Sequence, residues 1–291
     1  MRPAASSTLA RFAATAVLVS AVLLPRSHRA DAGAEEPAKA PAGGDAVREI
    51  RVLAVAGREY RTFYPDWQQR TGELVAAASR RIEPALGLRF TVADYRAWDY
   101  EQAPKTAGEG FRRLHQIEPG DCDLVVAFTL VTFPGPTAGA EIRGVSNFFS
   151  QYVLIPDQWG ARGATTRLVH ELCHTFGAFH VADPVSVMRP AFERTPSKFT
   201  FGEAAQQVVR LTRDVDLRRG VESLDAKTMA KVRSLYRQQH HPLERAADDP
   251  IVCGYRYQAH RAEWAGDTER AKALTETAER LAADPEQGGT P

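Results

Sequence analysis

The segment HELCHTFGAFH, from His170 to His180, constrains the fold of this chain more than any other feature. On an α-helix, His170 and His174 lie one turn apart on the same face, with Glu171 beside them. Gly177 lets the chain leave the helix sharply, so that His180 can return to the same point. Three neutral imidazoles leave one tetrahedral position open for water, as in catalytic zinc sites. The segment therefore predicts a zinc-carrying helix; the alternative is a surface helix that carries histidines by chance.

A methionine follows this segment at a regular spacing. The full pattern HExxHxxGxxH resembles that of the metzincin zinc metallopeptidases. Met188, eight residues after His180, resembles the Met-turn that passes beneath the metal in that family. A single methionine after a proline-containing loop is otherwise usually core filling.

Details of the pattern bear on the subfamily. Residues 188–192 resemble the matrixin form of the Met-turn, with Arg189 where an aromatic residue is commoner. Val181 stands where reprolysins usually have aspartate, and no tyrosine ligand follows Met188. The resemblance is to matrixin-like and reprolysin-like bacterial members and is specific over residues 165–192.

This resemblance implies a zinc-dependent endopeptidase. One catalytic zinc ion would be held by His170, His174 and His180 and would acidify a bound water. Glu171 would take the proton of that water and deliver it to the leaving amine of a peptide or protein substrate. No Asp-rich loop indicates a structural calcium ion.

The resemblance also implies substrate-binding elements. Pro190 and Phe192 would form a wall of the pocket for the residue after the scissile bond. The segment from Gly144 to Phe149 would be an edge strand that pairs with extended substrate, or else an ordinary edge strand without a ligand.

Two other functions remain open at this point. The zinc site could hydrolyse a non-peptide amide, because specificity is set by loops. The chain could instead be an exported zinc-binding scaffold or protein-interaction protein. Glu171 argues against the scaffold, since a purely structural site has no need of a base.

Hydrophobic periodicity predicts an α+β domain. Strands are expected over residues 49–57, 88–98, 122–130, 142–149 and 151–156, and helices over residues 67–82 and 165–176. Pro84 is expected to stop the first of these helices. The apolar run at 122–130 is typical of a central strand covered on both faces. The resemblance implies a twisted, mainly parallel sheet with an antiparallel edge strand.

The N-terminus has the pattern of an export signal. Arg2 and Arg11 precede an apolar run over residues 12–24, and Ala30-Asp31-Ala32 supplies a cleavage site. We expect a signal peptide at 1–32, although an uncleaved anchor is possible, and a flexible linker at 33–46. The mature chain is then expected to be exported to the periplasm, cell envelope or medium, with no stable membrane span.

A metzincin-like domain is expected over residues 47–220 and a helical region over 221–291. Helices are expected over residues 203–217, at the end of the metzincin-like domain, and over residues 224–239, in the helical region. Residues 250–285 resemble one tetratricopeptide helix pair, which we expect to pack on the catalytic domain; a partner-binding module is the alternative. His240 and His241 are expected to be solvent-exposed rather than metal-binding.

The composition of the chain bears on which partners it can bind. With 44% hydrophobic and 25% charged residues and a formal net charge of +1, the chain gives no reason to expect nucleic acid or an anionic membrane as partner. Oligomeric state and the pairing of Cys122, Cys173 and Cys253 stay open. Cys173 flanks the zinc helix and is expected to be a buried thiol, with a fourth zinc ligand as the alternative.

Overall fold

The computed structural model describes residues 46–135, 141–142, 144–158, 160–190, 200–239 and 249–283. The expected signal peptide, most of the expected linker, Phe192 and the His240–His241 pair lie outside these residues. None of the helices in these ranges is long and apolar enough to cross a membrane.

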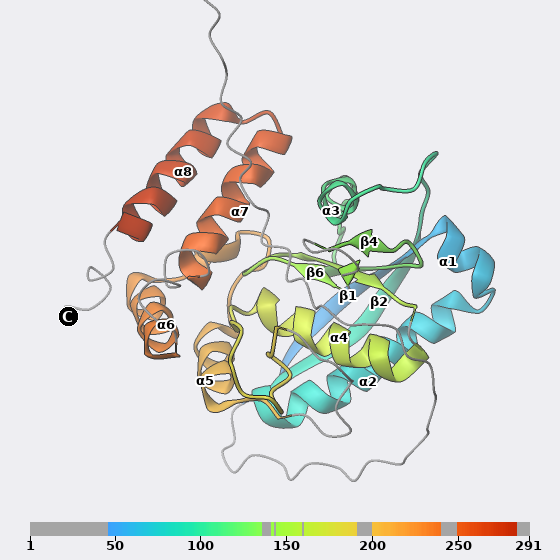
Figure 1. Cartoon of the computed structure of the whole chain (residues 1–291), viewed down its shortest axis with the longest axis horizontal. Helices are drawn as coiled ribbons and strands as arrows, with labels where there is room; N and C mark the ends of the chain where they lie inside the picture. Colours follow the sequence, from blue (N-terminus) through green and yellow to red (C-terminus); the bar gives the residue numbers. More distant parts are fainter. Residues whose placement is uncertain are drawn as a thin grey trace, which may run out of the picture.

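A five-stranded mixed sheet forms the centre of the molecule (Figure 1). Its order is β2-β1-β3-β7-β6, with strands β1 (Arg48–Gly57), β2 (Leu88–Trp98), β3 (Leu124–Thr129), β6 (Val145–Ser146) and β7 (Tyr152–Pro156). Strands β2, β1, β3 and β7 are parallel to one another, and β6 runs antiparallel to β7. Strands β4 (Phe133–Pro134) and β5 (Glu141–Ile142) pair separately. The expected mainly parallel sheet with an antiparallel edge is confirmed, although β6 is much shorter than the strand expected over residues 142–149.

The central strands are buried on both faces. In β3, Val126 and Phe128 enter one core cluster while Val125 and Ala127 enter another. Neighbouring strand residues point to opposite faces, so a strand covered on both sides is apolar at every position. The helices provide this cover.

The helices lie on both sides of the sheet and at its end. They are α1 (Arg58–Phe63), α2 (Trp67–Leu86), α3 (Ala107–Leu114), α4 (Gly160–Thr175), α5 (Glu203–Thr212), α6 (Ala226–Gln239), α7 (Pro250–Trp264) and α8 (Thr268–Ala283), with a 3₁₀ turn η1 (Gly220–Ser223). Figure 1 shows α2 and α4 on one face of the sheet and α3 on the other.

Several helix boundaries differ from the sequence expectations. Helix α2 passes Pro84 and ends at Leu86, because the proline stands only two residues from the end and Gly87 caps the helix in a left-handed conformation. Helix α4 begins at Gly160, earlier than expected. Helix α5 stops at Thr212, because a turn follows in which the Val215 amide donates to the Thr212 carbonyl.

Helices α1 and α3 were not expected from periodicity. Helix α3 nevertheless has a local start signal: the Thr106 hydroxyl accepts a hydrogen bond from the Glu109 amide, and the Glu109 carboxylate accepts one from the Lys105 amide. This reciprocal arrangement resembles a capping box, which a T-x-x-E pattern encodes.

The C-terminal helices pack into the same core as the sheet. Ile251 and Cys253 of α7 join the cluster under α4, and Tyr257 joins the cluster on the α3 side. Helices α7 and α8 form a hairpin that buries Ala262 and Leu274 between them. The hairpin therefore covers one end of the sheet.

Candidate metal centre

Helix α4 brings the first two histidines together inside the molecule. Leu168, Val169 and Leu172 anchor the helix in the core. His170 and His174 are each 2% exposed. Burial this complete demands partners for their ring nitrogens.

The chain then turns back to add His180. Gly177 takes a positive φ of 77°, and its amide donates to the His174 carbonyl. This left-handed glycine ends the helix and reverses the chain. The Nε2 atoms of His170 and His180 lie 3.3 Å apart, and those of His170 and His174 lie 3.0 Å apart. The three histidines form a group able to hold a metal ion.

Main-chain carbonyls determine which ring nitrogens carry protons. The Nδ1 atom of His170 lies 2.6 Å from the Val187 carbonyl oxygen, and that of His174 lies 2.6 Å from the Ala178 carbonyl oxygen. A carbonyl oxygen only accepts, so each Nδ1 must be the donor. In a neutral ring the Nε2 atom is then unprotonated.

Burial keeps these rings neutral. It lowers the pKa of His170 to about 4, and the Arg167 charge acts in the same direction. The pKa of His174 falls well below its usual range, mainly through burial and then through the two neighbouring histidines. Two Nε2 lone pairs consequently face each other without a proton between them, which is unfavourable unless a cation lies there.

The donor set fits zinc. Three imidazole nitrogens at the zinc–nitrogen distance of about 2.0–2.1 Å would be separated by about 3.3 Å in a tetrahedron. The Nε2 separations of 3.0 Å (His170 to His174) and 3.3 Å (His170 to His180) lie near that value. Hydrogen bonds from Nδ1 to carbonyl oxygens are the usual way in which proteins orient metal-binding histidines.

Glu171 lies against the edge strand. It is 1% exposed, and its Oε2 accepts a 2.6 Å hydrogen bond from the Ser146 hydroxyl. Burial raises the pKa of Glu171 to about 8, while the Ser146 hydrogen bonds and the Arg167 charge oppose that rise. Within the described part of the chain, Ser146 is thus the hydrogen-bond partner of this side chain, and no ion pair neutralises it.

Gly144 is packed directly on Glu171. A β-carbon added at Gly144 would overlap the Glu171 carboxylate and lie 2.7 Å from its Cγ. The resemblance implies a place for Gly144 in a substrate-binding edge; the structure places its bare backbone against Glu171. Ser146, two residues on, is a site residue that sequence reasoning missed, because nothing in the local pattern distinguishes it.

The segment around Met188 is hydrogen-bonded to the chain around the histidines. The Val187 carbonyl accepts from His170, and the Met188 carbonyl accepts from the Val181 amide. Met188 is fully buried in the core, whereas Pro190 is exposed at the surface. Phe192, the other residue expected in the pocket wall, lies outside the described residues.

The three cysteines are buried, and they form no disulfide within the described residues. Cys173 is 2% exposed and packs in the apolar core; it does not belong to the histidine group. Burial strongly raises the pKa of its thiol, which disfavours the thiolate that binds metals.

No protein-family profile matches the chain, and no curated protein matches its sequence. One similar solved structure is archaemetzincin from Methanopyrus kandleri, with 20% identity, a TM-score of 0.43, and coverage of 57% of this chain and 96% of that chain. Another belongs to a chaperone–substrate complex, with 14% identity, a TM-score of 0.44, and coverage of 59% of this chain but only 35% of that chain. Both TM-scores are low, so neither likeness defines the fold.

Proposed function

We propose that this protein is a zinc-dependent hydrolase and, more narrowly, a metzincin-type endopeptidase. The observation that carries the proposal is the orientation of His170 and His174. Their Nδ1–H groups donate hydrogen bonds to main-chain carbonyls, so their Nε2 atoms carry the lone pairs. These lone pairs converge in a buried space with His180 beside them. That arrangement suits a cation and leaves a coordination position free.

The chemistry that zinc supplies when bound is acidification of water and polarisation of a carbonyl. The chain itself supplies the proton transfers. Glu171 follows His170 directly, so its carboxylate lies beside the histidine group without belonging to it. Glu171 accepts the proton of the attacking water and passes it to the departing amine. Ser146 orients the carboxylate through its hydroxyl.

The substrate is proposed to be a peptide in extended conformation. Strand β6 is the last strand of its sheet within the described residues, and it carries Ser146 next to the base. An extended peptide could add to this edge through main-chain hydrogen bonds. This route would bring a scissile bond alongside Glu171 and the histidines, which favours peptide over other amides.

Other parts of the sequence assignment remain part of this proposal. We infer export through the signal peptide at 1–32, a Met-turn role for Met188, and substrate contacts for Pro190 and Phe192. We also propose a division at residue 220 into a catalytic domain and a helical region. The α7–α8 hairpin at the end of that region packs on the catalytic domain.

The test is cleavage of casein and of a quenched peptide library by the purified chain, with and without a chelator. Cleavage that stops with chelator and returns with zinc is the expected result. Glu171→Ala should bind zinc and cleave nothing. Full activity of Glu171→Ala, or cleavage indifferent to chelator, would contradict the mechanism.

A further inference from the structure

A cavity of about 690 Å³ lies away from the histidine group, where the end of α3 meets the start of β7 and the end of α7. Its wall includes Arg112, Arg218 and Arg261 together with His115, Gln151 and Trp264. Its volume is within the range of small-molecule sites, about 300–1,000 Å³.

The charge of this wall is positive. Three arginines face one glutamate, Glu118, among the lining residues. His115 adds no charge, because burial lowers its pKa to about 3. A cavity with a positive surplus attracts an anion.

The arginines of the wall have no carboxylate partner among the described residues. Arg218 donates to the carbonyls of Gly120 and Cys122, and Arg261 donates to the Arg218 carbonyl and to the amide oxygen of Gln258. Within the described residues, Arg112 has no hydrogen bond or ion pair. Their charges are therefore available to a ligand.

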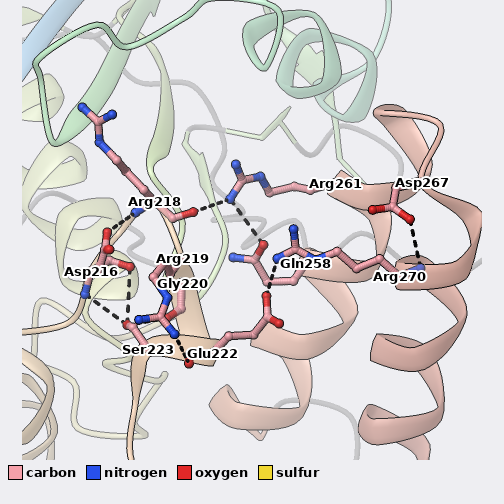
Figure 2. A network of polar contacts seen from close by, with 10 residues as sticks. All are labelled: Asp216, Arg218, Arg219, Gly220, Glu222, Ser223, Gln258, Arg261, Asp267 and Arg270. Carbon is pink, nitrogen blue, oxygen red and sulfur yellow. Dashed lines mark hydrogen bonds and ion pairs between the residues drawn. The ribbon is translucent and has the colours of Figure 1, made fainter.

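Two carboxylates near the cavity but outside its wall have other partners. Figure 2 shows the network that ties η1 to α7 and α8 beside the cavity. Glu222 pairs with Arg270, and Asp216 accepts from the Arg218 amide. The Arg218 side chain points away from the other residues of that network (Figure 2). Arg218 and Arg261 are therefore held by uncharged oxygen acceptors, and within the described residues no carboxylate neutralises them.

A buried donor also lines the cavity. Gln151 is 3% exposed, and its Nε2 atom has no hydrogen-bond partner in the described chain. An unpaired buried donor is costly and normally has an acceptor in the functional state. An oxyanion in the cavity would supply one.

Flat rings complete the wall. The His115 ring lies 4.1 Å from the Tyr152 ring and 4.9 Å from the Trp264 ring, measured between centroids. A Tyr257 hydroxyl hydrogen bond fixes His115 at Nε2. Such a rigid aromatic surface suits a planar apolar group.

We infer that this cavity binds a small oxyanionic ligand, a carboxylate or phosphate carried on a flat ring. The guanidinium forks of Arg112, Arg218 and Arg261 take the oxygens, since their geometry matches both anions. Gln151 donates a further hydrogen bond, and Trp264 contacts the ring. The site is separate from the proposed zinc chemistry and does not depend on it.

The experiment is calorimetric titration of the purified chain with phenyl phosphate, with benzoate and with uncharged benzyl alcohol. We expect one molecule of phenyl phosphate or benzoate to bind per chain, and benzyl alcohol not to bind. Comparing the two anions identifies which oxyanion the arginines prefer. Binding of neither anion, or equal binding of benzyl alcohol, would overturn the inference.

Variants locate the binding. Arg112→Gln should weaken the anion about tenfold, because it removes one charge-assisted contact and no bond within the described fold. Arg256→Gln is the matched control, an arginine of α7 that does not line the cavity. Equal affinity of these two variants would place the anion elsewhere. Ligand quenching of tryptophan fluorescence should disappear in Trp264→Phe, and Glu171→Gln should bind the anion like wild type.

Discussion

At the scale of single residues, the protonation of His170 and His174 follows from main-chain geometry. Each ring donates a hydrogen bond from Nδ1 to a main-chain carbonyl in the segment after α4. The Val187 carbonyl sits one residue before Met188, so the loop after the histidines determines the tautomer. The HExxHxxGxxH pattern predicts which residues meet. The hydrogen bonds that fix the histidine tautomers can be seen only in the three-dimensional structure.

Replacing Glu171 by glutamine separates binding from catalysis. The amide keeps the size of the side chain but cannot accept a proton from water, so peptide cleavage should fall by about 10²–10⁴-fold. Zinc content, measured by mass spectrometry of the metal, should stay at the wild-type level because Glu171 is not in the histidine group. Loss of zinc in this variant would show that Glu171 is a ligand.

Gly144→Ala tests whether Glu171 must keep its position. The added methyl group would overlap the carboxylate, so Glu171 must move and cleavage should fall, by about tenfold or more. Zinc affinity should change little. Gly108→Ala is the control, because nothing lies within 4 Å of its added carbon. Equal activity of the two variants would remove the steric role of Gly144.

At the scale of elements, the turn after the edge strand packs against two segments that are distant in sequence. Phe149 has a positive φ of 59° and is fully buried. Added β-carbons at Gly177 and Gly254 would lie 2.5 Å and 3.0 Å from its ring, so the end of α4 and helix α7 both leave room for it. The turn that follows Ser146 is thus fixed by glycines distant in sequence.

Gly177→Ala should destabilise the fold by about 3 kcal/mol, from a left-handed backbone and overlap with Phe149. Gly266→Ala is a matched control, because Gly266 has a φ of 78° but no atom within 4 Å of the added carbon. It should cost about 1 kcal/mol. Urea unfolding measures both, and equal losses would show that Phe149 packing contributes nothing.

A buried ion pair joins α6 to α7. Arg233 Nε donates to Asp249 Oδ2 over 2.8 Å, and both side chains are nearly inaccessible. Asp249→Asn removes the negative charge of this buried pair and should cost about 3–5 kcal/mol. The exposed Glu222–Arg270 pair provides the control, since Glu222→Gln should cost less than about 1 kcal/mol. Denaturant unfolding that ranks the two variants equally would contradict this.

At the scale of the whole molecule, the sequence predicted the strands of the parallel sheet better than the helices around it. Strand β2 falls at the predicted residues because its β-rich run is bounded by Gly87. Helix α2 passes Pro84 because the proline stands near the helix end, where burial of Ile82 and Leu86 and the Gly87 cap outweigh one lost hydrogen bond. The arginine-lined cavity has no sequence signature, since its wall comes from four distant segments.

The metal-free chain should lose stability in mild acid. The pKa of His115 is about 3 in the fold because of burial, against about 6.5 in the unfolded chain. Below about pH 6.5 the unfolded state therefore binds a proton that the fold does not, and the free energy of unfolding falls as the pH drops toward 3. His170 and His174 act in the same direction. Urea unfolding at pH 7.5 and pH 5 should show this loss, and His115→Gln should reduce it.

The most direct test of the account is the zinc content of the purified chain, measured by metal mass spectrometry after dialysis. We expect one zinc per chain, because the three histidines form a single group, and we expect its loss in His174→Ala. A folded wild-type chain that takes up no zinc, or a His174→Ala variant that retains it fully, would contradict the central claim.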